Sequence, residues 1–286
     1  MTIALFGNTY KRQTLNEVEH LLALLKEKDI RVLLSQELRH EMNLVSDYEP
    51  FTRETQEEVA FAISVGGDGT FLTTAAEVVE KDIPILGINC GHLGFLTAAT
   101  TEDVDAVVDR VLEGDYVISE RSMLQVSTIG GGHVMMPYAL NEVAVLKQEL
   151  SSMISVETTL DGEHLHTYKA DGLVVSTPTG STAYNLSAGG PLISPYVSAL
   201  ALTPIATHSL YVRPLIIPDD RKIEMKIHSR SGSYLISVDG RSQALKEEVS
   251  LVVERAPYTV KLMMLPDRGF IETLKQKLLW GQTNIH

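Results

Sequence analysis

One short stretch of the sequence combines groups that bind phosphate with a group that accepts a proton. SVGGDGT, residues 64–70, places Gly66, Gly67 and Gly69 around Asp68. It lies between a predicted strand and a predicted helix, where backbone N–H groups favour an anion and glycines let a phosphate approach the main chain. Asp68 is either the N-cap of this helix or a reacting carboxylate. No Walker lysine follows and no GxGxxG is present, so neither standard nucleotide fingerprint applies.

A second glycine-rich loop, GINCGHLGFL, spans residues 87–96. It follows an apolar strand pattern, so it should lie at the carboxyl end of that strand, where open α/β sheets bind ligands. The alternative is a tight connection in which Phe95 and Leu96 are buried. His92 could contact a ligand, although a loop histidine more often bonds to its neighbours.

Two adjacent polar residues, Asn141 and Glu142, interrupt the apolar pattern of ALNEVAVL, residues 139–146. In a half-buried strand one of them would point inward, and an inward Asn or Glu needs hydrogen-bond partners. The alternative is a pair of polar residues at a strand end, in a loop.

Hydrogen-bonding side chains are concentrated in YKADGLVVSTPTGSTAYNLSAGG, residues 168–190, after a strand pattern. Packing alone does not explain so many polar groups. Tyr184 offers a flat face with a polar tip, which suits stacking on a base. A hydrolase with a GxSxG nucleophile is disfavoured, because TGSTAYN lacks the second glycine. The polar residues are Lys169, Asp171, Thr177, Thr179, Ser181, Thr182, Tyr184, Asn185 and Ser187.

Composition disfavours several other functions. The chain has 286 residues, a formal net charge of −13 and a pI of about 5.1, which argues against nucleic-acid binding. Cys90 is the only cysteine, so an intramolecular disulfide and multi-cysteine zinc sites are excluded, and we expect its thiol to be dispensable. We find neither a signal peptide nor a membrane span and expect a soluble cytoplasmic protein that binds no membrane.

The first third of the sequence alternates strand and helix patterns. Thr14 and Glu17 predict a capping box at the start of the first helix. The alternation predicts a parallel, Rossmann-like sheet covered on both faces, in an α/β domain of residues 1–116. The predicted strands are 2–6, 30–34, 58–65 and 83–88, and the predicted helices are 14–29, 70–81 and 101–114.

After residue 117 the pattern changes to short alternating strands. A hairpin is predicted over 154–168 about Asp161-Gly162, and another over 221–240 about Ser231-Gly232. Two further strands are predicted at 249–255 and 258–265. We expect an all-β, sandwich-like domain over residues 117–265, with only 181–190 briefly helical.

The tail, residues 266–286, contains an amphipathic helix pattern over 267–280. Its apolar stripe needs a partner, so we expect the tail to pack back on the first domain. The stripe consists of Phe270, Ile271, Leu274 and Leu278.

The four polar and glycine-rich motifs, in this order, resemble those of the ATP- or polyphosphate-dependent NAD kinases. GGDGT, GINCGHLGFL, LNEV and DGLVVSTPTGSTAYNLSAGGP all match the pattern of that family. GGDGT alone is shared with lipid kinases and, loosely, phosphofructokinases, whereas the last motif is far more specific. The resemblance implies an active site in the cleft between two domains. It also implies transfer of the γ-phosphoryl group of ATP to the 2′-hydroxyl of the adenosine ribose of NAD, giving NADP.

The resemblance further implies roles for individual residues. Asp68 is the base that accepts the hydroxyl proton, and Gly66, Gly67, Gly69 and Thr70 form the loop for the donor phosphates. A divalent cation, magnesium or manganese, accompanies ATP, and no residue is expected to be a dedicated metal ligand. The residues expected to contact NAD are Asp68, Gly69, Asn141, Glu142, Ser152, Lys169, Asp171, Thr182, Ala183, Tyr184, Asn185, Leu186, Ser187 and Arg241.

The sequence departs from the family pattern in places. Thr73 stands where other members often carry a basic residue near the donor phosphates. Lys169 replaces an arginine, which gives a point charge in place of a bidentate fork. VDGRSQ, residues 238–243, is longer than the usual DGQ, so either Arg241 or Gln243 makes the equivalent contact. Ser152 aligns with a variable contact position.

Two alternatives stay open beside an NAD kinase. One is a lipid or sugar kinase that shares only the GGDGT loop, and residues 168–190 argue against it. The other is a non-catalytic NAD(P)-binding regulator, and the presence of Asp68 argues against that. The resemblance suggests a homodimer or homotetramer, with exposed strands of the β domain as the interface. The sequence does not decide whether polyphosphate or NADH is used, or which metal is preferred.

Overall fold

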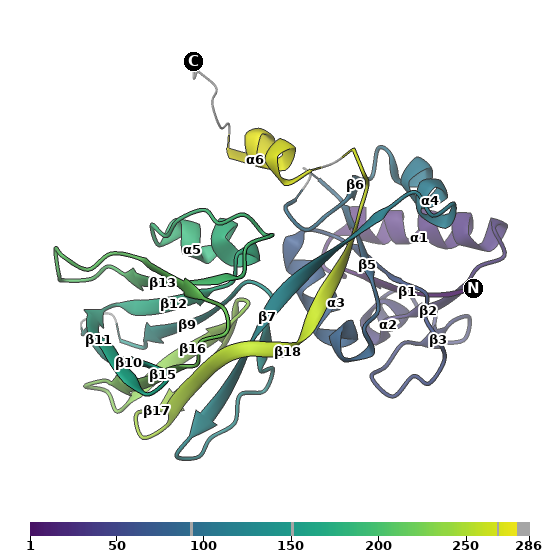
Figure 1. Cartoon of the computed structure of the whole chain (residues 1–286). Coiled ribbons are helices and arrows are strands. Elements are labelled where there is room, and N and C mark those ends of the chain that lie inside the picture. Colours follow the sequence, from purple (N-terminus) through teal and green to yellow (C-terminus); the bar gives the residue numbers. More distant parts are fainter. Residues whose placement is uncertain (92–93, 150–151, 268, 279–286) are drawn as a thin grey trace. The chain divides into compact units, whose positions relative to one another are not determined.

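The computed structural model describes residues 1–91, 94–149, 152–267 and 269–278. The chain divides into two compact units, Met1–Glu120 with the segment from Val260 onward, and Arg121–Thr259 (Figure 1). The first unit alternates strands and helices, and the second consists almost entirely of strands. The predicted combination of an α/β part and an all-β part is confirmed.

The α/β unit is built on a parallel sheet of strand order β5-β4-β1-β2-β3. The chain moves outward from β1 through β2 to β3, then crosses to the other side of β1 for β4 and β5. Open α/β sheets bind ligands beyond the carboxyl ends of the strands at such a reversal. The strands are β1 (Thr2–Gly7), β2 (Arg31–Leu34), β3 (Glu49–Pro50), β4 (Ala62–Val65), β5 (Ile85–Asn89) and β6 (Ala99–Thr100).

Helices cover both faces of this sheet. Val18 and Leu25 of α1 pack into one apolar cluster with Ile3 and Leu5 of β1, whereas Phe71 of α3 is buried outside that cluster. This two-sided burial explains why the strands are continuous apolar runs. The helices are α1 (Arg12–Glu27), α2 (Gln36–Glu41), α3 (Asp68–Val78, extended by a 3-10 turn, Val79–Lys81), α4 (Val104–Leu112) and α6 (Phe270–Leu278).

The start of α1 differs from the prediction. The helix begins at Arg12, and its N-cap Lys11 makes no side-chain capping bond. Thr14 is fully buried inside the first turn, where its hydroxyl lies beside the thiol of Cys90. The predicted capping box of Thr14 and Glu17 is therefore wrong, because the threonine faces the interior of the unit.

The β unit contains two antiparallel sheets, of order β11-β10-β15-β18 and β14-β13-β12-β9-β16-β17. Val143 and Val145 of the second sheet share one apolar cluster with Val156 and Ile227 of the first, as expected for a sandwich. The elements, of which β7 and β18 each have one end in the α/β unit, are β7 (Val117–Ile129), β8 (Tyr138–Ala139), β9 (Glu142–Lys147), β10 (Ile154–Leu160), β11 (Glu163–Ala170), β12 (Gly172–Ser176), a 3-10 turn (Thr179–Thr182), α5 (Tyr184–Ser187), β13 (Ala199–Ile205), β14 (Leu215–Pro218), β15 (Ile223–His228), β16 (Ser233–Val238), β17 (Arg241–Lys246) and β18 (Ser250–Met264).

One of the two predicted hairpins is confirmed and the other is wrong. Strands β10 and β11 pair about Asp161-Gly162, both of which have positive φ. The segment at Ser231-Gly232 instead connects β15 of one sheet to β16 of the other. The second hairpin joins β16 and β17 through Asp239, at φ 48°, and Gly240, at φ 80°. A sequence pattern of two strands and a turn does not show whether the strands pair with each other.

Residues 250–264 form one long strand where two were predicted. Pro257 lies between Leu251–Val253, which pair with β15, and Leu262, which pairs with β5, so it interrupts neither of these two ladders. In α6, Phe270 lies 6.5 Å from Phe95 between ring centroids, and Leu274 is buried, but Ile271 is exposed. The predicted tail helix includes residue 268 and runs into 279–286, which lie outside the described residues.

No helix within the described ranges is long and apolar enough to cross a membrane.

Candidate functional site

The glycine loop after β4 has an open backbone at the start of α3. Gly66 has a φ of 149°, and a Cβ there would lie 2.3 Å from the hydroxyl oxygen of Thr70, so only glycine fits. Gly67 and Gly69 are exposed, and no described atom lies within 4 Å of a Cβ built on either one. The predicted phosphate loop therefore presents free main chain to an approaching anion.

Asp68 does not cap the helix. The N-cap of α3 is Gly67, and Asp68 is the first helical residue. The Asp68 carboxylate instead accepts hydrogen bonds from the N–H groups of Phe95 and Leu96, both at 3.1 Å. The N-cap alternative is therefore wrong. A carboxylate has about four lone-pair sites, so Asp68 can still accept a hydrogen bond from a substrate.

The loop at 87–96 is shaped to meet Asp68. A Cβ on Gly94 would lie 2.0 Å from the Asp68 carboxylate, and a Cβ on Gly87 would lie 2.7 Å from the carbonyl oxygen of Leu96. The two glycine motifs, far apart in the sequence, thus form one structure that holds the carboxylate. The expected burial holds for Leu96, while Phe95 is half-buried. His92 lies outside the described residues.

Cys90 is half-buried in the same loop. Burial raises the pKa of its thiol, and the Thr14 hydroxyl opposes that increase. A raised pKa leaves less of the nucleophilic thiolate, which supports the expectation that the thiol is dispensable.

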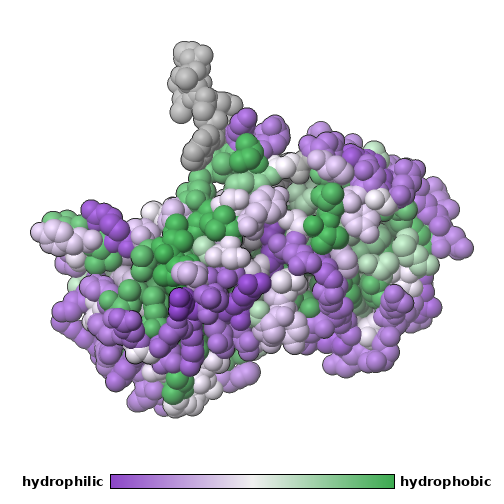
Figure 2. Space-filling model, in the orientation of Figure 1, coloured by the Kyte–Doolittle hydropathy of each residue, from purple (hydrophilic) through white to green (hydrophobic). Residues whose placement is uncertain are grey.

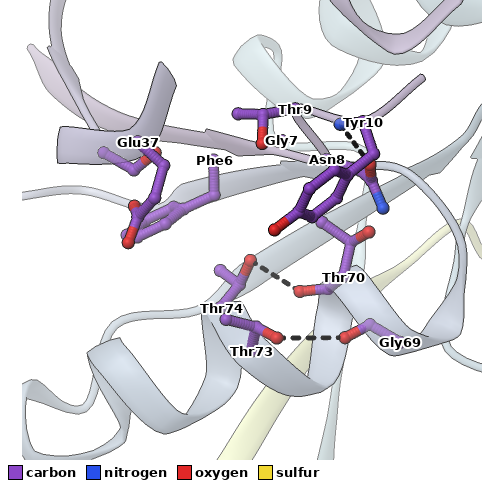
Figure 3. A pocket seen from close by; sticks show the side chains of 11 residues that line it. Phe6, Gly7, Asn8, Thr9, Tyr10, Glu37, Gly69, Thr70, Thr73 and Thr74 are labelled. Atoms are coloured by element: carbon purple, nitrogen blue, oxygen red, sulfur yellow. Dashed lines mark hydrogen bonds between the residues drawn. The ribbon is translucent and has the colours of Figure 1, made fainter. Parts of the chain in front are cut away.

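A cavity of about 240 Å³ lies at the carboxyl end of β1, beside the glycine loop (Figure 3). Figure 3 shows Tyr10 and the loop after β1 on one side, the first turns of α3 below, and Phe6 and Glu37 at the far end. In α3, Thr73 and Thr74 donate to the carbonyl oxygens of Gly69 and Thr70. The cavity thus occupies the position where the strand order reverses. The sequence did not predict this cavity, although Asn8–Tyr10 directly follow the first strand.

In the β unit, Asn141 and Glu142 lie where β9 begins, and each is only 7% exposed. The N–H groups of Leu140, Asn141 and Glu142 all donate to the carboxylate of Asp239, at 2.8, 2.8 and 3.1 Å. Burial raises the pKa of Asp239, and these three N–H groups oppose the increase. The VDGRSQ motif contains Asp239, but the sequence did not predict these bonds, because the second hairpin turn was expected at Ser231-Gly232.

Glu142 is a buried carboxyl group with unused hydrogen-bonding capacity. The backbone N–H of Tyr184 bonds to it, but Oε2 is buried and has no hydrogen-bond partner among the described residues. Burial, and then the nearby Asp239 charge, raise its pKa to about 7. A buried acceptor without a partner costs free energy, and a ligand hydroxyl would remove that cost.

The segment at 182–187 presents some side chains and buries others. Tyr184 is 37% exposed, and Glu142 and Asp171 help to raise its pKa after the larger effect of burial, so these three groups lie near one another. Asn185 is fully buried, and its amide bonds to Ser181, Pro191 and Thr203. Ser187 is exposed, and the half-buried residues are Thr182, Ala183 and Leu186.

The remaining predicted contacts lie apart from one another. Asp171 forms an ion pair with Lys147 at 2.8 Å. Ser152 and Lys169 line another hollow of the β unit, about 620 Å³ in volume, together with His208 and His228. The structure therefore does not place Ser152 and Lys169 in the group around Glu142.

Of the two alternatives near the second hairpin, Arg241 lies closer to the Glu142 group. Its guanidinium donates to the carbonyl oxygens of Val238 and Tyr138 and lies 4.0 Å from the Asp239 carboxylate. Gln243 bonds instead to the carbonyl oxygen of His133. Among the described residues, no three His, Cys, Asp or Glu side chains are grouped to hold a metal ion.

Comparison with protein families gives two adjacent matches along the chain. Residues 3–116 match the ATP-NAD kinase N-terminal domain, and residues 140–265 match the ATP-NAD kinase C-terminal domain. An NAD kinase of Bacteroides fragilis is 42% identical over 285 residues, covering 98% of each chain. An NAD kinase of Flavobacterium psychrophilum is 39% identical over 290 residues, covering 99% of each chain.

Two solved structures are similar to the whole chain. An NAD kinase from Archaeoglobus fulgidus in complex with ATP superposes with a TM-score of 0.77 at 26% identity, covering 98% of this chain and 99% of that one. A yeast NADH kinase complexed with NADH superposes with a TM-score of 0.89 at 23% identity, covering 99% of this chain and 89% of that one. At 23% identity, the similarity to the yeast enzyme shows the fold alone.

Proposed function

Because the chain belongs to the NAD kinase family, we propose that it transfers the γ-phosphoryl group of ATP to the 2′-hydroxyl of the adenosine ribose of NAD. The single observation that carries the mechanism is the Asp68 carboxylate, held by two N–H groups beside the open backbone of Gly67 and Gly69. The family matches in both domains disfavour a lipid or sugar kinase that shares only the GGDGT loop.

In the proposed step, the 2′-hydroxyl oxygen forms a bond to the γ-phosphorus while the bond from phosphorus to the β–γ bridging oxygen breaks. ADP leaves with that electron pair, and Asp68 accepts the hydroxyl proton. Phosphoryl transfer depends mainly on positioning and on stabilising the charge of the transferred group. The glycine N–H groups at the start of α3 supply that stabilisation without reorganising.

We propose that the β unit binds NAD mainly through the group around Glu142. Its unpartnered Oε2 accepts a ribose hydroxyl of NAD, and the half-exposed ring of Tyr184 stacks on a base. Asn185 is assigned a structural role, because its amide is already bonded within the protein. Further proposed contacts are Asn141, Asp171, Thr182, Ala183, Leu186, Ser187 and Arg241. For Ser152 and Lys169, contact with NAD stays a prediction.

For the donor, the cavity at the end of β1 favours a nucleoside triphosphate over polyphosphate. The exposed ring of Tyr10 offers a face to a base, and Phe6 adds apolar lining, whereas Glu37 would repel a long polyanion. Its lining, as far as the described residues form it, includes no lysine or arginine. We propose that magnesium or manganese enters with ATP, since such ions are bound chiefly through substrate phosphates and one or two carboxylates.

A homo-oligomer is the proposed assembly. Leu210 and Tyr211 are 82% and 92% exposed, and Ile216 on β14 is also exposed. Figure 2 shows apolar areas among the hydrophilic residues that cover most of the visible face. A second copy that covers Leu210, Tyr211 and Ile216 would remove apolar surface from water. Light scattering after size-exclusion chromatography should give a mass above 31.5 kDa.

Product analysis tests the proposed function. The purified chain, NAD and MgATP should yield NADP, measured by its reduction with an NADP-specific dehydrogenase. NAD that lacks the 2′-hydroxyl should give no phosphorylated product, and polyphosphate should replace ATP poorly. Phosphorylation of diacylglycerol but not of NAD, or binding of NAD without turnover, would contradict the proposal.

A further inference from the structure

We propose that Asp239 is a positioning residue for NAD: its buried carboxylate holds the backbone of residues 140–142 so that Asn141 and Glu142 face the dinucleotide. The inference rests on the proposed function, since it takes this segment to contact NAD. Asp239 does not itself touch the ligand and acts only through the backbone that it holds.

The carboxylate of Asp239 bonds to three successive N–H groups. Oδ1 accepts from Asn141 at 2.8 Å and from Glu142 at 3.1 Å, and Oδ2 accepts from Leu140 at 2.8 Å. The side chain is only 2% exposed. Hydrogen bonds to an ionised acceptor are about twice as strong as neutral ones, so this one group fixes three consecutive peptide planes.

The carbonyl side of the same segment is held by residues 177–180. The Thr177 hydroxyl donates to the carbonyl oxygen of Leu140 at 2.6 Å, and the Thr177 N–H donates to that of Asn141 at 2.9 Å. A Cβ on Gly180 would lie 2.1 Å from the Asn141 carbonyl oxygen, so only glycine permits this approach. With both sides held, the directions in which Asn141 and Glu142 project are fixed.

An Asp-Gly hairpin turn does not by itself require a buried aspartate carboxylate. Asp161 occupies the same position in the hairpin of β10 and β11, with φ 50° against 48° for Asp239, and each is followed by a glycine with positive φ. The Asp161 carboxylate is exposed and bonds to Lys222 and Arg221. The chain thus contains an Asp-Gly turn without a buried carboxylate, which provides a matched control.

Three variants test the inference: Asp239→Asn, Asp239→Ala and Asp161→Asn. Asparagine tolerates the positive φ of the turn and keeps one acceptor oxygen, but its NH₂ group would face the remaining N–H. We expect calorimetry to show NAD affinity reduced about tenfold in Asp239→Asn and about 100-fold in Asp239→Ala. The kcat at saturating NAD and the KM for ATP should change less than about twofold, and Asp161→Asn should match the unsubstituted chain.

A purely structural role for Asp239 would give a different result. It would lower the melting temperature and the active fraction, hence the apparent kcat, while the folded fraction bound NAD normally. If Asp239→Ala does not fold, Asp239→Asn decides: NAD affinity within twofold of the unsubstituted chain, or an equal loss in Asp161→Asn, overturns the inference. Failure of the proposed function would appear separately, as no NADP formation by the unsubstituted chain.

Discussion

The Asp68 carboxylate is bonded to the N–H groups of Phe95 and Leu96, so its position depends on the neighbouring Gly94. A Cβ on Gly94 would lie 2.0 Å from the carboxylate oxygen, whereas the nearest atom to a Cβ on Gly91 lies 3.7 Å away. Gly94→Ala should displace the carboxylate and lower kcat by at least about 100-fold, with little change in NAD affinity. Gly91→Ala is the control, and equal kcat values in the two variants would contradict this account.

Glu142 predicts a pH dependence of stability. Its pKa is about 7 in the folded chain and 4.5 when unperturbed. Between these values the unfolded chain has lost the proton that the folded chain retains, so rising pH favours unfolding until the folded carboxyl also ionises. Glutamine carries no such proton. The free energy of unfolding of Glu142→Gln, relative to the unsubstituted chain, should therefore increase between about pH 4.5 and pH 7.5, by up to about 3 kcal/mol.

Denaturant titrations at several pH values measure this difference. A difference that is constant across the range would show that the Glu142 carboxyl is not protonated in the folded chain near neutral pH. Loss of NAD affinity in the same variant, at a pH where it is more stable, would separate the ligand role of Glu142 from its effect on folding.

Cys90 lies two residues from the part of its loop that is not described, yet its thiol has no proposed part in the reaction. Cys90→Ser replaces the thiol with a hydroxyl that can still hydrogen-bond to Thr14, and the variant should keep most of the activity. A loss of kcat beyond about 100-fold, with an unchanged circular dichroism spectrum, would correspond to about 2.7 kcal/mol of transition-state stabilisation and would show that the thiol takes part.

At the scale of elements, two adjacent glycines of the β4–α3 turn are expected to have different roles. Gly66 is required for the fold, and Gly67 is proposed to contact the phosphates of ATP. Gly66→Ala forces a side chain into a φ of 149° and against Thr70, so it should lower the melting temperature. Gly67→Ala meets no described atom within 4 Å, so it should fold normally but raise the KM for ATP by obstructing the phosphates. Thermal melts and ATP titrations distinguish the two, and similar effects on both quantities would contradict the assignment.

The sequence predicted which segments form strands and helices better than it predicted which strands pair with each other. Apolar runs and helical spacing identified β1, β4 and α3, because burial imposes those periods locally. They did not show that β15 and β16 belong to different sheets, since pairing depends on distant strands. For the same reason the sequence suggested Asp68 and Glu142 as site candidates but did not predict the bonds of the Asp239 carboxylate or those from Asp68 to Phe95 and Leu96, which join segments far apart in the chain.

At the scale of the whole molecule, the proposed reaction divides between the two units. The α/β unit carries Asp68 and the loop proposed for the donor phosphates, and the β unit carries the group around Glu142 that we propose contacts NAD. An acidic chain of net charge −13 can still bind two anionic substrates, because backbone N–H groups supply local positive potential. The division predicts that chemistry and NAD binding can be impaired independently.

The measurement that tests this most directly is the kcat of Asp68→Asn together with its NAD affinity by calorimetry. Asparagine keeps one acceptor oxygen for the loop but cannot take the hydroxyl proton. General-base contributions are typically about 10² to 10⁴-fold. The kcat should therefore fall by about 100-fold or more, while NAD affinity changes little. A variant that binds NAD and retains a near-native kcat would contradict the assignment of Asp68 as the proton acceptor.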